Sequence, residues 1–154
     1  MPAYFFDSSA IVKRYLNEQG SAWVATTVDP TSHPHIYVAA ITGVEVVAAL
    51  ARKLKGRLLS TPVAAEAVSR FHRDFASEYR TIGISDAVVT RSMALAEAHA
   101  LRGYDAVQLG AALEVDGRRV AFGATTPLTL VTADDELLNA AAAEGLLTDN
   151  PNIH

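Results

Sequence analysis

Four carboxylates in this sequence stand where a folded chain could use them to hold a cation. Asp7 follows the apolar run at 3–6, Asp134 follows the apolar run at 128–131, and Asp105 opens a candidate helix. Glu45 lies on the shoulder of a helical apolar stripe, where a carboxylate is partly desolvated. An unpaired buried carboxylate costs several kcal/mol and neighbouring carboxylates repel one another, so a divalent cation is the ordinary partner of such a group.

The types of ligand on offer narrow the choice of cation. The chain contains no cysteine, so a metal would have to be held by oxygen or imidazole. Mg²⁺ and Mn²⁺ suit all-oxygen sites, keep part of their water shell and readily take phosphate oxygens as further ligands. The four acids together therefore indicate phosphate chemistry at a Mg²⁺ (or Mn²⁺) site.

Each acid also has a structural interpretation when it is taken alone. Asp7 could cap the helix that follows it, and Glu45 could pair with an arginine or turn toward water. Asp105 and Gln108 have the spacing of a capping box. Capping explains three of the acids separately but leaves Glu45 unexplained, and this favours a common site.

The fourth acid has a neighbour that could take its place. Thr132 and Asp135 also have a capping arrangement, which leaves Asp134 free to face inward. Two adjacent acids cannot be told apart by pattern, so Asp135 stays an alternative to Asp134.

The composition predicts one compact domain. The 154 residues are 50% hydrophobic and 19% charged, and the formal net charge is −4. No apolar stretch reaches the roughly 20 residues that a membrane span needs, and no basic region precedes an apolar core near residue 1, so we expect neither a span nor a signal peptide. The absence of cysteine fits the cytoplasm. The acidic balance argues against broad electrostatic binding of nucleic acid but leaves room for a local site.

Short apolar runs alternate with helical patterns along the whole chain. We expect strands at 3–6, 79–84, 128–131 and 146–148, with the run at 36–39 as a strand or the lead-in to a helix. We expect helices at 9–18, 21–28, 41–55, 61–78, 85–101, 105–115 and 134–144. This alternation predicts an α/β fold with a central, mainly parallel sheet flanked by helices.

Three finer expectations concern single segments. The helix at 41–55 should pack through an apolar stripe made by Val44, Val47, Ala48, Ala51 and Leu54. The stretch at 118–127 should be a loop or a strand and loop. The domain should span 1–148, and 149–154 should form a loosely tied tail.

Four segments resemble, in order, the motifs of the PIN-domain ribonucleases, and most closely the VapC-type toxins of toxin–antitoxin pairs. They are FFDSSAIVKRYL at 5–16, ITGVEVVAALARK at 41–53, LRGYDAVQLGAAL at 101–113 and LVTADDELLNAA at 130–141. The match runs from the first residues to about 147. Each motif is short and degenerate, but four of them in family order make a fairly specific signal. The stretch at 118–127 is longer than the brief link expected before the last motif.

The resemblance implies a PIN-like fold and a metal-dependent ribonuclease. The catalytic and metal-binding acids would be Asp7, Glu45, Asp105 and Asp134. Ser9 would orient a ligand or water beside Asp7, and Thr132 would support the loop that carries Asp134. The alternative is that Ser8 and Ser9 serve only as helix-start residues. The resemblance also implies a Mg²⁺ (or Mn²⁺) cofactor, an RNA substrate, a homodimer, and a small antitoxin protein that covers or disturbs the acidic site.

Basic residues near the acids are candidates for steering the RNA backbone. They form two groups, Lys13 with Arg14, and Arg52 with Lys53, Lys55 and Arg57. Solvated helix ends are the alternative interpretation of both groups.

Two rival functions remain open. One is a PIN-fold RNA- or protein-binding module that does not cleave, and the other is a phosphatase of a different acidic α/β class. A dehalogenase-type phosphatase would need a second aspartate two residues after the first, and Ser9 stands there.

Overall fold

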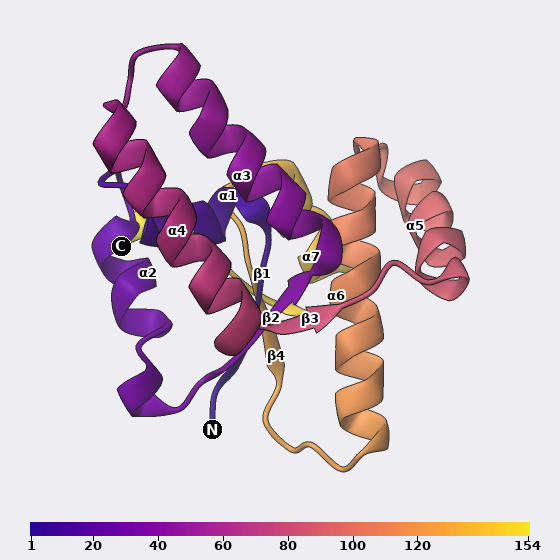
Figure 1. The fold of residues 1–154 in the computed structure, drawn as a ribbon. Helices are drawn as coiled ribbons and strands as arrows, with labels where there is room; N and C mark the ends of the chain where they lie inside the picture. Colours follow the sequence, from indigo (N-terminus) through magenta and orange to yellow (C-terminus); the bar gives the residue numbers. More distant parts are fainter.

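A five-stranded parallel sheet forms the centre of the protein in the computed structural model, which describes all of residues 1–154 (Figure 1). The strands are β1 (Ala3–Phe6), β2 (His35–Ala39), β3 (Arg80–Ile82), β4 (Leu128–Val131) and β5 (Leu147–Asp149). Their order is β3-β2-β1-β4-β5, and every neighbouring pair is parallel. The predicted α/β class is therefore confirmed, and the carboxyl ends of all five strands meet at one edge, where open α/β sheets bind ligands.

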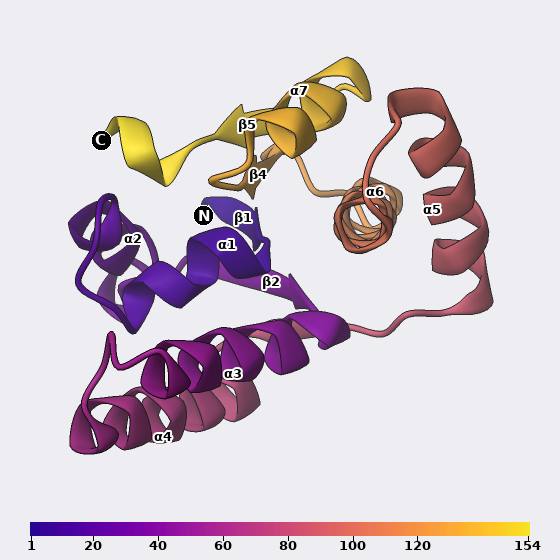
Figure 2. The same ribbon diagram turned by 90° about the horizontal axis from the view of Figure 1, so that it is seen from above.

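Helices cover both faces of this sheet (Figure 2). The helices are α1 (Ser8–Ile11), α2 (Ser21–Thr27), α3 (Ala40–Lys55), α4 (Thr61–Ser77), α5 (Asp86–His99), α6 (Gly103–Ala121) and α7 (Asp135–Ala143), with single 3-10 turns at η1 (Val12–Arg14), η2 (Pro30–Ser32) and η3 (Pro151–Ile153). The first four helices lie on one face, and α5, α6 and α7 lie on the other. None of these helices combines the length and the apolar composition needed to span a bilayer.

Successive side chains of β1 point into two separate hydrophobic cores, one on each face of the sheet. Phe5 points into the core under α5, α6 and α7, where it joins Leu109 and Leu130. Phe6 points to the opposite face and joins Phe71 under the other helices. Because side chains alternate along a strand and both faces are covered, the strands read as continuous apolar runs.

The helix α3 forms as expected but buries a different face from the predicted one. Its buried residues are Thr42, Val46 and Leu50, whereas Val44 of the predicted stripe is 65% exposed. The buried position of Thr42 follows from a hydrogen bond that its hydroxyl accepts from Gln108 Nε2 at 2.9 Å. The sequence pattern treated Thr42 as polar, so the predicted stripe lies on a different side of the helix from the buried residues.

Two other expectations about segments are wrong. The helix α6 continues to Ala121, so residues 118–121 are helical and only 122–127 form a loop. Gly117 lies inside this helix, and Arg118 pairs with Glu114 at 2.9 Å one turn earlier, a favourable placement for a cation near a helix C-terminus. The helix expected at 9–18 is shorter, since α1 ends at Ile11 and η1 follows it.

The last six residues are not a loosely tied tail. Asp149 ends β5, Pro151 is buried, and His154 stacks on Trp23 with ring centroids 4.4 Å apart. Gly20 comes so close to Pro151 that a Cβ atom at position 20 would lie 2.5 Å from the Pro151 carbonyl oxygen. The C-terminus therefore packs against the segment that follows α1.

Candidate active site

Asp7 lies at the end of β1 and is only 3% exposed. Its Oδ1 accepts hydrogen bonds from Ser9 Oγ at 2.7 Å and from the Ala10 amide at 2.9 Å, and its Oδ2 accepts one from Thr132 Oγ1 at 2.7 Å. Asp7 is therefore the N-cap of α1, as its structural interpretation predicted, and neither Ser8 nor Ser9 is the cap. Burial raises the pKa of Asp7 to about 6; the three hydrogen bonds partly oppose this effect and the negative charge of Asp105 adds to it.

A hydroxyl pair joins the loops that follow β1 and β4. Thr132 Oγ1 donates to Asp7 and accepts from the Asp134 amide at 3.0 Å, while Ser9 Oγ accepts from the Ala133 amide at 3.0 Å. Neighbouring β1 and β4 bring these residues together from 125 positions apart in the sequence. The orientation of Asp7 is thus set by the loop that also carries Asp134.

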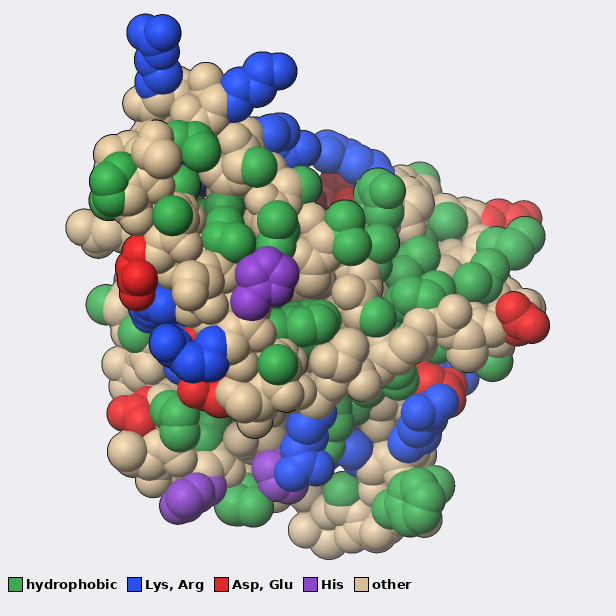
Figure 3. Space-filling model, viewed as in Figure 1, with side chains coloured by type: hydrophobic (Ala, Val, Ile, Leu, Met, Phe, Trp, Pro, Cys, Tyr) green, Lys and Arg blue, Asp and Glu red, His purple; other side chains and the backbone are tan.

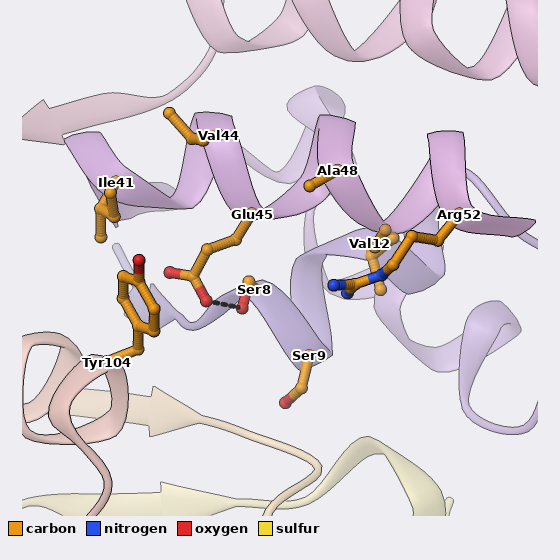
Figure 4. A pocket seen from close by; sticks show the side chains of 10 residues that line it. Ser8, Ser9, Val12, Ile41, Val44, Glu45, Ala48, Arg52 and Tyr104 are labelled. Carbon is orange, nitrogen blue, oxygen red and sulfur yellow. Dashed lines mark hydrogen bonds between the residues drawn. The ribbon is translucent and has the colours of Figure 1, made fainter.

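Glu45 reaches toward this edge from α3 and has a protein donor on each oxygen. Ser8 Oγ donates to Oε2 at 2.8 Å (Figure 4), and Gln108 Nε2 donates to Oε1 at 2.8 Å. No arginine pairs with Glu45, so the ion-pair alternative does not hold. Gln108 is 1% exposed and links α3 to α6 through Glu45 and Thr42, and it takes no part in a capping box with Asp105.

Asp105 lies in the first turn of α6 and accepts no hydrogen bond from the protein; the N-cap of this helix is Arg102. Partial burial raises the pKa of Asp105, and so do the negative charges of Asp134, Glu45 and Glu136, whereas Arg102 lowers it. The charged form of Asp105 is therefore disfavoured both by burial and by the other acids.

Asp134 is the N-cap of α7, and only one of its oxygens is used for this purpose. Oδ1 accepts from the amides of Glu136 at 2.9 Å and Leu137 at 3.1 Å, while Oδ2 accepts nothing. The expected cap formed by Thr132 and Asp135 is therefore wrong. Asp135 is exposed and accepts instead from Asn150 Nδ2 at 3.2 Å, whereas the negative charge of Asp134 raises the pKa of Asp105.

The two basic groups behave differently from each other. Lys13 is buried and donates to Glu18 at 3.2 Å and to the Gln19 carbonyl at 2.9 Å. Arg14 pairs with Glu78 at 2.7 Å and with buried Asp74 at 3.5 Å. Both cations thus have partners within the protein, and their part in steering RNA stays a prediction.

The second basic group remains at the surface. Arg52 is exposed, makes no ion pair or hydrogen bond, and lines a pocket next to Glu45. Lys53 lies 4.0 Å from Glu18, at the limit of an ion pair. Arg52 is therefore the cation of the group that borders the acids.

Four residues at the site were assigned no functional part by the sequence pattern. Ser8 and Gln108 hold Glu45, Glu136 adds negative charge near Asp105, and Tyr104 lines the pocket beside the acids. Ser8 and Gln108 could have been found only by knowing which helices meet. Tyr104 carried a local signal, since it precedes Asp105 directly.

The chemistry of these donors fits an oxygen-ligated divalent cation. Four carboxylates gather at one edge, burial and mutual repulsion raise two of their pKa values, and both Asp105 and Asp134 keep oxygens that no protein group engages. No three acidic or imidazole side chains converge closely enough to enclose an ion by themselves. Mg²⁺ is commonly bound through one or two carboxylates and completes its shell with water and phosphate oxygens.

Known proteins resemble this chain in both sequence and fold. No family model matches the chain. Ribonuclease VapC45 of Mycobacterium tuberculosis (strain CDC 1551 / Oshkosh) is 36% identical over 115 residues, which are 75% of this chain and 78% of the relative. The crystal structure of VapBC2 from Rickettsia felis, bound to a DNA fragment from their promoter, matches with a TM-score of 0.62 at 14% identity over 96% of this chain and 98% of that one. The crystal structure of FitAcB from Neisseria gonorrhoeae matches with a TM-score of 0.60 at 16% identity over 96% and 97%. The solved structures support the fold and the sequence relative supplies the family: this chain belongs to the VapC family of PIN-domain ribonucleases.

Proposed function

We propose that this protein hydrolyses RNA phosphodiester bonds at the acidic edge of its sheet, with Mg²⁺ or Mn²⁺ as cofactor, as the toxin of a toxin–antitoxin pair. The relative that carries this proposal is named a ribonuclease. The structural observation that supports it concerns the Asp105 carboxylate. No protein group donates a hydrogen bond to this carboxylate, and the negative charges of Asp134 and Glu45 raise its pKa. Carboxylates left in that state call for a cation.

Each acid has a defined part in this proposal. Asp105 and the free Oδ2 of Asp134 would be direct ligands, and Glu45 would face the cation or its water because Ser8 and Gln108 fix its orientation. Asp7 would contribute from its buried position at the end of β1, where Ser9 and Thr132 donate hydrogen bonds to its carboxylate. A bound divalent cation would lower the pKa of a water molecule and neutralise charge that develops on the phosphate. None of the chain's side chains is needed as a nucleophile.

The test is cleavage of a fluorescently labelled transfer RNA in buffers that contain MgCl₂, MnCl₂ or EDTA. We expect wild type to cut with either metal and not in EDTA. Asp105→Asn should be at least about 100-fold slower, because removing one essential electrostatic group commonly costs 10²–10³ in rate. Glu66→Gln is the matched control, an exposed carboxylate on α4 that lies away from the site and should leave the rate unchanged. RNA that stays intact under every metal condition, or equal rates for Asp105→Asn and wild type, would contradict the proposal.

The binding module without cleavage is the second candidate function, and the same assay decides it. A module of this kind would retain RNA in a gel-shift experiment while leaving it intact with both metals. The clustered acids argue for cleavage, since RNA binding alone gains nothing from a cluster of negative charges next to a polyanion.

We propose that the antitoxin binds along the groove between α3 and α4. This groove is lined by apolar residues that include Val47, Ala51 and Leu54, and its two cavities have volumes of about 410 and 540 Å³. Figure 3 shows hydrophobic side chains gathered over these two helices. Val44 and Ala48 belong both to the groove and to the pocket beside Glu45, so a segment lying in the groove would reach the acids.

Co-expression with the adjacent gene of the native operon tests this surface. We expect the small partner to co-purify with wild type and with Val63→Glu, a control that places a charge on an exposed valine of α4 outside the groove. Ala51→Glu should abolish co-purification, because Ala51 lines both cavities of the groove. Retention of the partner by Ala51→Glu would contradict the assignment.

We further propose a homodimer that acts in the cytoplasm, where RNA substrates are available. Light scattering should give a mass near twice the 16.4 kDa of the chain. A monomeric mass would contradict the dimer. A dimer that Ala51→Glu alone dissociates would assign the groove to the second copy instead of the antitoxin.

A further inference from the structure

A pocket with a volume of about 430 Å³ lies beside the acids, between α1, α3 and the first turn of α6 (Figure 4). Its walls are formed by Ser8, Ser9 and Glu45 on one side and elsewhere by Val12 of η1 and apolar side chains of α3. Tyr104 and Arg52 stand on either side of Glu45 in this pocket. A flat aromatic group and a cation therefore flank the carboxylate.

Tyr104 has no structural task that would explain its position. Its side chain is 64% exposed, its hydroxyl makes no hydrogen bond, and no other aromatic ring or cation packs on it. Each of the other four tyrosines either donates a hydrogen bond, carries a neighbouring arginine or packs on another ring. An exposed aromatic ring directly before Asp105 is available for stacking on a ligand.

The Arg52 side chain likewise has no ion-pair or hydrogen-bond partner in the protein. Lys13, Arg14 and Lys53 each lie within 4.0 Å of a carboxylate, whereas Arg52 has no such partner. Its guanidinium lies at the opposite end of the pocket from Tyr104. Because an arginine fork matches the geometry of phosphate oxygens, this end of the pocket suits a phosphate.

We propose that this pocket is a nucleotide subsite in which an unpaired base stacks on Tyr104 and a flanking phosphate binds Arg52. The inference rests on the proposed ribonuclease function, which it extends by naming the residues that seat the RNA next to the acids. Stacking on a protein ring requires a base released from its own helix, since a paired base has both faces covered. The subsite thus selects an unpaired nucleotide at the cut and sets the distance from its base to the scissile phosphate.

Binding is tested in the Asp105→Asn background, so that RNA stays intact in MgCl₂. The probe is a fluorescein-labelled single-stranded 12-nucleotide RNA of mixed sequence, and the readout is fluorescence anisotropy. We expect Tyr104→Leu to weaken binding on the order of 10- to 100-fold, the usual effect of losing one stacked base, and Tyr104→Phe to retain affinity. Arg52→Gln should lower the slope of log affinity against log salt by about 0.7, the value for one phosphate contact on a single strand. Lys55→Gln, a change of a cation on the same helix outside the pocket, should leave the slope nearly unchanged.

Substrates with one abasic position separate stacking from a general structural effect. Cleavage is measured with protein that retains Asp105. For this protein, one abasic position near the cut should raise the KM of the RNA. On the abasic RNA, Tyr104→Leu should raise KM no further. Equal affinity of Tyr104→Leu and its parent, a salt slope unaffected by Arg52→Gln, or a Tyr104→Leu effect confined to antitoxin binding would each overturn the subsite. Binding that depends on Tyr104 and Arg52 in a protein that never cleaves would instead leave the subsite standing and refute the ribonuclease.

Discussion

Replacing Asp7 by asparagine should stabilise the metal-free protein while it disables the site. Asp7 is 3% exposed, and burial raises its pKa from 3.8 to about 6. The difference is about two pH units, and each unit corresponds to about 1.4 kcal/mol, so ionised Asp7 lowers the free energy of unfolding by about 3 kcal/mol. The substituted amide would carry no charge to desolvate, although one hydrogen bond to Thr132 would need to be rearranged at a cost of about 1 kcal/mol.

The direction of the pH dependence follows from the two protonation states. Asp7 loses its proton near pH 3.8 in the unfolded chain and near pH 6 in the folded one. Between these values the folded protein binds more protons, so its free energy of unfolding falls as the pH rises. The favourable contribution of protonated Asp7 is fully present below about pH 3.8 and is lost as the pH rises through about 6.

The assay is urea unfolding in EDTA, followed by the fluorescence of the single tryptophan, Trp23. We expect Asp7→Asn to exceed wild type by about 2 kcal/mol at pH 7.5, and we expect that difference to shrink by about 2 kcal/mol at pH 4. Glu66→Gln, at an exposed position, should track wild type at both pH values. A difference between Asp7→Asn and wild type that does not vary with pH would refute the reasoning, because burial of the charge would then not be its cause.

Three further outcomes are expected. Gly20→Ala should destabilise the protein by about 2 kcal/mol or more in urea unfolding, because Gly20 has a φ of 84° and an added Cβ would meet the Pro151 carbonyl. Gly117→Ala is the control, at a helical position with open space around it, and should stabilise the protein by up to about 1 kcal/mol. Asp74→Ala should cost about 3 kcal/mol by the same measurement, because buried Asp74 accepts from Tyr15 at 2.9 Å and pairs with an arginine; a loss below about 1 kcal/mol would show that this network contributes little. MgCl₂ at 100 times its dissociation constant should raise the free energy of unfolding of wild type by about 2.7 kcal/mol, and an equal gain for Asp105→Asn would place the cation elsewhere.

Local pattern was enough to predict the parallel sheet and most of the helices. The strands at 3–6 and 128–131 match β1 and β4 residue for residue, since short apolar runs bounded by acids and turns leave little choice. The same pattern placed two acids after strands, and parallel pairing of β1 with β4 brings the loops that carry them together.

The errors arose where contacts between distant segments decide the outcome. The buried face of α3 depends on Thr42 meeting Gln108 of α6, which no count of apolar residues along one helix reveals. Arg14 looked like a surface cation because its partners Asp74 and Glu78 lie far along the chain, at the end of α4. The role of Ser8 beside Glu45 was hidden for the same reason.

In the proposed function, the acids at the sheet edge hold the cation that serves RNA cleavage. Anomalous scattering from crystals grown with MnCl₂ tests it most directly, because the peak reports where the metal lies. We expect a peak in contact with Asp105 and within reach of Asp134 and Glu45, and the loss of this peak in Asp105→Asn. A wild-type peak away from these carboxylates, or none at a Mn²⁺ concentration that supports cleavage, would contradict it.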